Sequence, residues 1–258
     1  MTNSPITRPT TGARGVSPIF LLIVLVFVGA GAELALGRGG QIGTFVFVFV
    51  GWLMSLCLHE WGHAVTAHAG GDRGIAERGY LTLDPLKYAN PLLSIVMPLV
   101  FLAMGGIGFP GGAVYVNKDA LKSKWWRAGT SAAGPAMNLA LLIMCAAVLR
   151  FAPVNELLAG GIAFLALLQA TAFVLNLLPI PGLDGFGVLE AFFPPHERAM
   201  IAPWTNIIFL IFFVLMVMAP QIFMPIFRTA QTLCNIAGVS STDMQSGLDQ
   251  FQFWSSGP

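Results

Sequence analysis

The sequence predicts a polytopic α-helical membrane protein with about five to six membrane helices. Of its 258 residues, 56% are hydrophobic and only 10% are charged, and the mean hydropathy is +0.76. Soluble globular domains carry about 25% charged residues, so this composition indicates a membrane protein. Apolar runs long enough to cross a hydrocarbon core of about 30 Å recur along the chain. The net charge of +1 does not indicate a nucleic-acid partner.

The chain is expected to form one membrane domain, because no internal repeat is evident and no polar stretch is long enough for a second folded unit. We expect a polar N-terminal tail over residues 1–16 and a single domain over 17–237, with its core over 42–190. The Ser-, Gln- and Gly-rich stretch 238–258 predicts a mobile C-terminal tail. The cysteines lie far apart in or beside apolar runs, which predicts buried free thiols at Cys57, Cys145 and Cys234.

The first apolar run, residues 18–36, follows a polar start that contains Arg8 and Arg14 and no acidic residue. A signal peptide cleaved after Ala32 is an alternative. The apolar character continues past Glu33, however, which makes the run long enough to span a membrane. Further spans are expected over 42–69, 128–151, 159–178 and 203–219, and a short or interfacial helix over 221–236.

A re-entrant or strand-containing segment is expected between the second and third spans. Residues 80–83 alternate in polarity before Asp84-Pro85, which predicts a short strand and a turn, and 113–116 predict a second strand. The stretch 117–127 is basic and is therefore expected on the cytoplasmic side, like the N-terminus. Residues 91–116 would then enter and leave the membrane on one side, with an ordinary single crossing as the alternative.

The second predicted span carries the pattern His59-Glu60-x-x-His63. Residues four apart share one face of a helix, so both imidazoles can bind one metal ion, and Glu60 can accept a proton from metal-bound water. Two core histidines and a stray glutamate are the alternative, but ionisable groups in a membrane helix are costly and usually functional. His59 lies 18 residues past Gln41, about 27 Å along a helix, so the site is expected near the cytoplasmic end.

A catalytic zinc ion usually has three protein ligands and one open position, so a third ligand is needed. His68 is rotated by about 180° from His59 on the helix and points away. Asp184 is a better candidate, because it follows an apolar span where Pro179 and Pro181 break the helix and allow polar groups to face a cavity. An ordinary Asp184-Gly185 turn is the alternative.

Two motifs in this order resemble the site-2 protease family of intramembrane zinc metalloproteases, in its minimal bacterial subgroup without PDZ or CBS domains. They are His-Glu-Trp-Gly-His at 59–63 and Asn-Leu-Leu-Pro-Ile-Pro-Gly-Leu-Asp-Gly at 176–185. Ser-Ala-Ala-Gly-Pro-Ala-Met-Asn at 131–138 resembles the family's Gly-Pro-x-x-Asn element. The resemblance implies a Zn²⁺ ion held by His59, His63 and Asp184, Glu60 as the catalytic base, and substrate binding by Asn176 and Asn138. A polar contact that braces neighbouring helices is the alternative for Asn138.

The function implied by the resemblance is hydrolysis of peptide bonds in transmembrane protein substrates. It also implies a bacterial plasma membrane, with the lipid bilayer as environment. The distribution of basic residues, and not the resemblance, predicts that the active site faces the cytoplasm. A helical substrate must extend before cleavage, and residues 80–83 and 113–116 are candidates to pair with it by strand addition. The alternatives are a non-catalytic membrane adaptor on a protease scaffold and a metal transporter. The membrane peptidases of the CAAX type instead supply a glutamate as third ligand.

Overall fold

The computed structural model describes residues 15–87, 114–252 and 254. All of the regular elements in this part of the chain are helical. Five helical stretches are long and apolar enough to cross a membrane, which confirms the predicted polytopic helical fold. They are α1 (Pro18–Ala35), α2 (Gly40–Gly70), α5 (Lys124–Phe151), α6 (Glu156–Asn176) and the stretch Pro195–Met218, which contains α8 (Pro195–Ile201) and α9 (Thr205–Met218).

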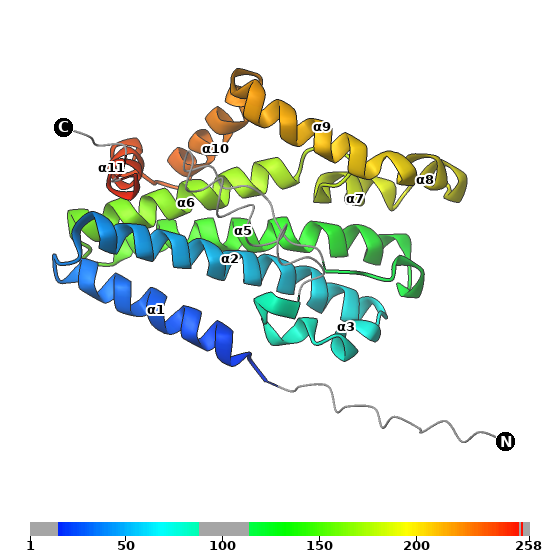
Figure 1. Cartoon of the computed structure of the whole chain (residues 1–258), viewed down its shortest axis with the longest axis horizontal. Helices are drawn as coiled ribbons and strands as arrows, with labels where there is room; N and C mark the ends of the chain where they lie inside the picture. The colour runs from blue at the N-terminus through cyan, green and yellow to red at the C-terminus, as the bar shows by residue number, and fades with distance from the viewer. Residues whose placement is uncertain (1–14, 88–113, 253, 255–258) are drawn as a thin grey trace.

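The centre of the fold is formed by α2, α5 and α6, which lie side by side with alternating directions (Figure 1). At one end of these helices, the amide of Lys122 donates to the carbonyl of Gly70 over 2.9 Å and joins the start of α5 to the end of α2. At the other end, the side-chain amide of Asn155 donates to the carbonyl of Leu34 over 2.8 Å. Both ends of the central bundle are therefore fixed by polar contacts between neighbouring helices.

The core between these helices is apolar and closely packed. It includes the fully buried side chains of Trp52, Phe164 and Leu168, and all three cysteines are buried and free, as predicted. Large side chains on the outer faces of α1 and α9 are exposed, as expected of helices that face lipid. They include Leu21, Leu22 and Leu25 on α1 and Leu210, Ile211 and Val214 on α9.

The predicted spans agree with the observed helices to within four residues at each end, and the larger differences have a capping cause. Sequence periodicity placed the third span from 128, but α5 begins at Lys124, because Oγ of Ser123 accepts from the amide of Trp126 over 3.3 Å. The fourth span begins at Glu156, because Oδ1 of Asn155 accepts from the amide of Leu158 over 2.9 Å. The helix predicted over 221–236 is the 3₁₀ turn Pro220–Phe223 followed by α10 (Met224–Ile236).

The strand predicted over 80–83 is wrong, because Tyr80–Thr82 forms a 3₁₀ turn after the short helix α3 (Gly74–Glu77). Thr82 closes this turn: its amide and its hydroxyl both donate to the carbonyl of Gly79, over 3.1 and 2.7 Å. Residues 114–116, the described part of the second predicted strand, have no regular secondary structure. The rest of the re-entrant segment predicted over 91–116 lies outside the described residues.

The C-terminal stretch contains a packed helix where a mobile tail was predicted. Helix α11 (Ser241–Phe251) lies against α6 and buries Met244, Gly247 and Phe251 on one face. Gly247 meets Gly160 of α6 so closely that a β-carbon at 247 would overlap with the Gly160 carbonyl. The polar composition of this stretch therefore concealed an amphipathic period of three to four residues.

Candidate metal centre

Helix α2 presents His59, Glu60 and His63 close to its C-terminal end, and all three residues are buried. One potential ligand atom from each lies within 4.8 Å of the others. The helical spacing therefore brings the two imidazoles together as the sequence predicts. His68, which was excluded as a ligand, lies in the last turn of α2 with its Nε2 3.5 Å from Nη1 of Arg73.

Asp184 is placed over the two imidazoles by the irregular chain between α6 and α7 (Asp184–Glu190). The amide of Leu183 donates to the carbonyl of Ile180 over 2.9 Å, which closes a turn that contains Pro181. Gly182 has a φ of 103°, in the left-handed region that favours glycine. A β-carbon at Gly185 would overlap with the carbonyl of Leu177. The glycines next to Asp184 are thus what allow the chain to fold back on itself and start α7.

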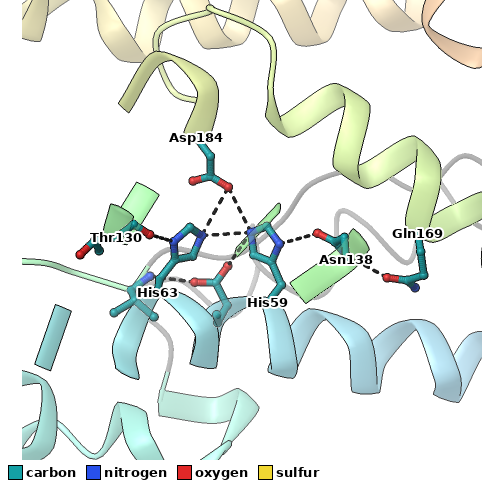
Figure 2. A network of polar contacts seen from close by, with 8 residues as sticks. His59, His63, Thr130, Asn138, Gln169 and Asp184 are labelled. Atoms are coloured by element: carbon teal, nitrogen blue, oxygen red, sulfur yellow. Dashed lines mark hydrogen bonds and ion pairs between the residues drawn. The ribbon is translucent and has the colours of Figure 1, made fainter. Parts of the chain in front are cut away.

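Three atoms converge to form a nearly equilateral triangle (Figure 2). Nε2 of His59 lies 3.1 Å from Nε2 of His63, and Oδ2 of Asp184 lies 3.2 and 3.3 Å from these two nitrogens. Zinc–nitrogen and zinc–oxygen bonds of about 2.0–2.1 Å in a tetrahedral site require ligand atoms about 3.3–3.4 Å apart. The triangle has nearly the size of one face of a tetrahedral zinc site.

The donor chemistry at this triangle also fits a cation. Oδ2 of Asp184 is buried and has no hydrogen-bond donor among the described residues. A buried carboxylate oxygen without a partner is costly, and a bound cation would satisfy it. Burial by itself would raise the pKa of Asp184, but the imidazoles of His63 and His59 outweigh this effect and hold that pKa below its ordinary value. The unpartnered carboxylate oxygen and the two neighbouring imidazole nitrogens therefore form a donor set that suits a metal ion.

Space at the triangle is left by a glycine on α5. A β-carbon at Gly134 would lie 2.5 Å from Nε2 of His59 and closer still to Nε2 of His63. Gly62 on α2 allows the same close approach of the two helices, since its β-carbon would lie 2.9 Å from the carbonyl oxygen of Ala133. Small residues at this crossing therefore bring α5 against the imidazoles without filling the position of a metal ion.

Both imidazoles are oriented through their other ring nitrogen (Figure 2). Nδ1 of His63 lies 2.7 Å from the carbonyl oxygen of Thr130, and Nδ1 of His59 lies 2.6 Å from Oδ1 of Asn138. A carbonyl oxygen can only accept, so Nδ1 of His63 is the donor of this contact and Nε2 is the nitrogen that faces the triangle. Histidines that bind metals almost always donate their second ring nitrogen in this way.

Glu60 lies beside the triangle rather than in it. Its Oε1 is 4.0 Å from Nε2 of His59, clearly farther than Oδ2 of Asp184, and its Oε2 accepts from the amide of Val114 over 3.0 Å. The geometry favours His59, His63 and Asp184 as the ligands. The carboxylate of Glu60 would then lie close to the fourth, open corner of the tetrahedral metal site.

The two asparagines proposed from the family resemblance have different surroundings. Asn138 is buried, with Oδ1 toward His59 and Nδ2 donating to Oε1 of Gln169 over 2.9 Å. Asn176 is buried at the last residue of α6. Gln169, which contacts Asn138, was not predicted as a site residue, although a glutamine inside the apolar run of α6 is a signal that could have found it. The carbonyl of Thr130 and the amide of Val114 are backbone groups, and no side-chain pattern reports them.

Comparison with known proteins identifies near-full-length relatives. The protein named "Putative zinc metalloprotease Rip2" of Mycolicibacterium smegmatis is 44% identical over 255 residues, which covers 96% of this chain and 98% of the relative. The protein of the same name in Mycobacterium tuberculosis is 45% identical over 246 residues, or 93% of this chain and 94% of the relative. "Putative zinc metalloprotease YwhC" of Bacillus subtilis is 34% identical over 182 residues, or 66% of this chain and 80% of the relative. No family model and no solved structure matches.

Proposed function

Because the chain belongs to the site-2 protease family of zinc metalloproteases, we propose that it is an intramembrane zinc endopeptidase that hydrolyses peptide bonds of transmembrane proteins. The observation that carries this proposal is the triangle formed by His59, His63 and Asp184, with the carboxylate of Glu60 beside it. These groups lie within a bundle of helices that are long and apolar enough to cross a membrane. The relatives named as zinc metalloproteases support the choice of metal.

Zn²⁺ would be held by Nε2 of His59, Nε2 of His63 and Oδ2 of Asp184, the three atoms whose separations fit a tetrahedral site. When bound in a site with one open position, zinc acidifies water and polarises a carbonyl group as a Lewis acid. The protein residues supply the rest of the chemistry. They orient the ligands, hold the base and exclude bulk water from the reacting groups.

Glu60 is the residue that we assign to proton transfer. Its carboxylate takes the proton of the attacking water and delivers it to the amine that leaves when the peptide bond breaks. The amide of Val114 donates to Oε2 over 3.0 Å, so one oxygen is held while Oε1 faces the imidazole of His59. The residue is only 2% exposed, which keeps bulk water from competing for the proton.

The metal end of the bundle is proposed to face the cytoplasm. The polar connection between α2 and α5 and the first turn of α5 together carry seven basic residues. At the other end, the connection between α1 and α2 carries only Arg38 and the last turn of α5 only Arg150. Cytoplasmic loops hold an excess of Lys and Arg, which favours this orientation. The seven residues are Arg73, Arg78, Lys87, Lys118, Lys122, Lys124 and Arg127.

The substrate is proposed to meet the site in an extended form, because a helix hides its peptide bonds. Residues 114–117 are non-helical, lie beside Glu60 and are held at Asn117, whose amide donates to Oδ2 of Asp72 over 2.8 Å. This segment is the proposed neighbour of an extended substrate. Asn176 remains the proposed hydrogen-bonding group for the substrate backbone, since the amide group of Asn138 contacts His59 and Gln169.

The proposal is tested by measuring zinc in the purified, detergent-solubilised protein and by comparing cleavage in cells. We expect about one zinc ion per chain in the wild type and in Glu60→Gln, and much weaker binding in His63→Ala and Asp184→Ala. Membranes that contain the wild type should accumulate new protein termini inside transmembrane segments, and those with Glu60→Gln should not.

Two alternatives predict other outcomes. A metal transporter should move zinc across vesicle membranes with little effect of Glu60→Gln, because a transit site does not need a base. A non-catalytic adaptor should show the same protein termini in wild-type and Glu60→Gln membranes. Either result would overturn the assignment as an endopeptidase.

A further inference from the structure

We propose that Gln169 and Ser55 act with Asn138 as a directional hydrogen-bond chain that fixes the protonation pattern of His59. The chain places the proton on Nδ1 and keeps Nε2 available to the metal. The inference rests on the proposed metalloprotease function, and it assigns Gln169 and Ser55 as positioning residues of that site. Neither residue contacts the converging ligand atoms itself.

The contacts run continuously from the metal site to the backbone of α2. Nδ1 of His59 lies 2.6 Å from Oδ1 of Asn138, whose Nδ2 donates to Oε1 of Gln169 over 2.9 Å, as Figure 2 shows. Nε2 of Gln169 then donates to Oγ of Ser55 over 3.0 Å. The hydroxyl of Ser55 donates to the carbonyl oxygen of Trp52 over 2.7 Å. Each distance is within the usual range for its type of hydrogen bond.

The direction of the whole chain follows from its last member. A backbone carbonyl has no proton, so the hydroxyl of Ser55 must donate to Trp52, and its oxygen accepts from the amide nitrogen of Gln169. The oxygen of Gln169 is thereby turned toward Asn138, which must donate to it. The remaining oxygen of Asn138 faces His59, so Nδ1 of His59 donates. A carbonyl in α2 thus decides which nitrogen of the imidazole keeps its lone pair.

Burial makes this direction hard to reverse. Asn138, Gln169 and Ser55 are each no more than 2% exposed, so water cannot replace a member that turns away. Reversing one amide group would set two donors or two acceptors against each other inside the bundle, and unpaired buried polar groups are costly. His63 reaches the same protonation pattern through a single contact with the carbonyl of Thr130. His59 reaches it through three side chains from three helices.

A general role in joining helices is the competing explanation, because polar side chains also hold membrane helices together. The two explanations differ for conservative variants. Gln169→Leu removes the contact with Asn138 and frees its amide group to turn. Gln169→Glu keeps an oxygen that accepts from Asn138, and its carboxyl group, neutral at this buried position, can donate from the second oxygen to Ser55 as the amide does. If Gln169 acts by positioning Asn138, Gln169→Glu should keep the zinc affinity that Gln169→Leu loses.

The experiment measures zinc affinity by competition with a chelator in the purified full-length protein. We expect Gln169→Leu to weaken zinc binding by about 10- to 100-fold, the usual effect of removing a partner of a ligand. Gln169→Glu should stay close to the wild type. Ser55→Ala should fall between them, because it removes only the group that sets the direction. The matched control is Thr171→Val on the same helix: Thr171 is buried, but its hydroxyl donates to the carbonyl of Leu167 and not to this chain.

A second readout reports the protonation pattern directly. The ¹⁵N chemical shifts of labelled histidine in the zinc-free protein distinguish protonated from unprotonated ring nitrogens, and His59→Gln identifies the signals. The wild type should show a protonated Nδ1 at His59, and Gln169→Leu should show a mixture of the two forms. A role limited to joining helices would lower the unfolding temperature without changing this pattern.

The possible failures can be told apart. If the wild type binds zinc and Gln169→Leu binds it equally well, the inference is wrong and the proposed function stands. Equal weakening by Thr171→Val, or an unchanged protonation pattern in Gln169→Leu, would also overturn the inference alone. If the wild type binds no zinc, the proposed function fails and the inference fails with it.

Discussion

A β-carbon at Gly134 would lie 2.5 Å from Nε2 of His59, inside the space on which the candidate ligands converge. The relationship connects two helices, since Gly134 belongs to α5 and His59 to α2. Gly134 is followed by Pro135 within α5, in the stretch that resembles the family's Gly-Pro-x-x-Asn element. The glycine of this element therefore has a structural reason in this chain: any side chain at 134 would overlap with the two imidazoles and fill the space on which the candidate ligands converge.

We accordingly expect Gly134→Ala to weaken zinc binding by about 100-fold or more, the upper part of the range for changes beside metal ligands. The added methyl group overlaps with both imidazoles, and at least one ring must turn away from the metal position. Zinc affinity by chelator competition is the measurement. Gly129→Ala is the matched control, because a β-carbon at Gly129 on the same helix meets nothing within 4 Å. Equal affinity in the two variants would contradict the assigned metal position.

Val114 gives a prediction about the base. Its amide donates to Oε2 of Glu60 over 3.0 Å, and hydrogen bonds to charged groups contribute about 1.5–3 kcal/mol. Val114→Pro removes this donor, so we expect the rate of cleavage to fall about tenfold or more while zinc affinity stays unchanged. Val114→Ala keeps the amide and serves as the control. A rate in Val114→Pro equal to that in Val114→Ala would show that the contact does not orient the base.

The membrane helices were predictable because each is marked by a long, continuous stretch of apolar residues. Hydropathy over about 20 residues locates a span, and a spacing of four puts His59 and His63 on one face. The four-residue pattern at 80–83 is too short for such a decision, because alternating burial also arises in a 3₁₀ turn, where Tyr80 and Thr82 are buried and Leu81 and Leu83 are only partly buried. The polar composition of 238–258 likewise predicted a mobile tail, because the buried face of α11 consists of only a few residues.

The ligand triangle was predicted in part from physics and in part by resemblance. Spacing pointed to His59 and His63, whereas Asp184 is separated from them by more than one hundred residues and two long helices. The broken helix before Asp184 made it a candidate, with an ordinary turn as the alternative, and the resemblance then implied its role as a ligand. The partner of Asn138 could not be read from the sequence, because the contact with Gln169 depends on the rotation of α6 against α5. Tertiary packing decides such contacts, and local periodicity does not report them.

Asp72 is predicted to hold residues 114–117 in place next to the site. It is buried beyond the end of α2 and accepts from the amides of Gly74 and Asn117 over 3.1 and 2.8 Å and from the guanidinium of Arg78 over 3.4 Å. Asp72→Asn removes the charge and turns one acceptor into a donor. We expect a loss of about 1–3 kcal/mol in the free energy of unfolding, from the buried groups left without a partner.

The same variant should also slow cleavage, because Val114 and its contact with Glu60 belong to the segment that Asp72 holds. Thermal unfolding and cleavage rate are the two measurements. Asp119→Asn, an exposed carboxylate in the next turn of the chain, is the control and should change neither quantity measurably. A stable Asp72→Asn protein with a normal cleavage rate would contradict the assigned role.

The contact between α6 and α11 gives the last prediction. A β-carbon at Gly247 would overlap with the carbonyl of Gly160 and lie 2.7 Å from Cβ of Phe164, so α11 cannot keep its position in Gly247→Ala. Overpacking of this kind costs about 1–3 kcal/mol. We expect a lower unfolding temperature and faster proteolysis within 238–252, while zinc affinity stays unchanged because α11 lies at the end of the bundle away from the metal centre (Figure 1). Gln245→Ala, at an exposed position of the same helix, is the control. Equally fast proteolysis of this stretch in the wild type and in both variants would instead support the mobile tail that the composition suggested.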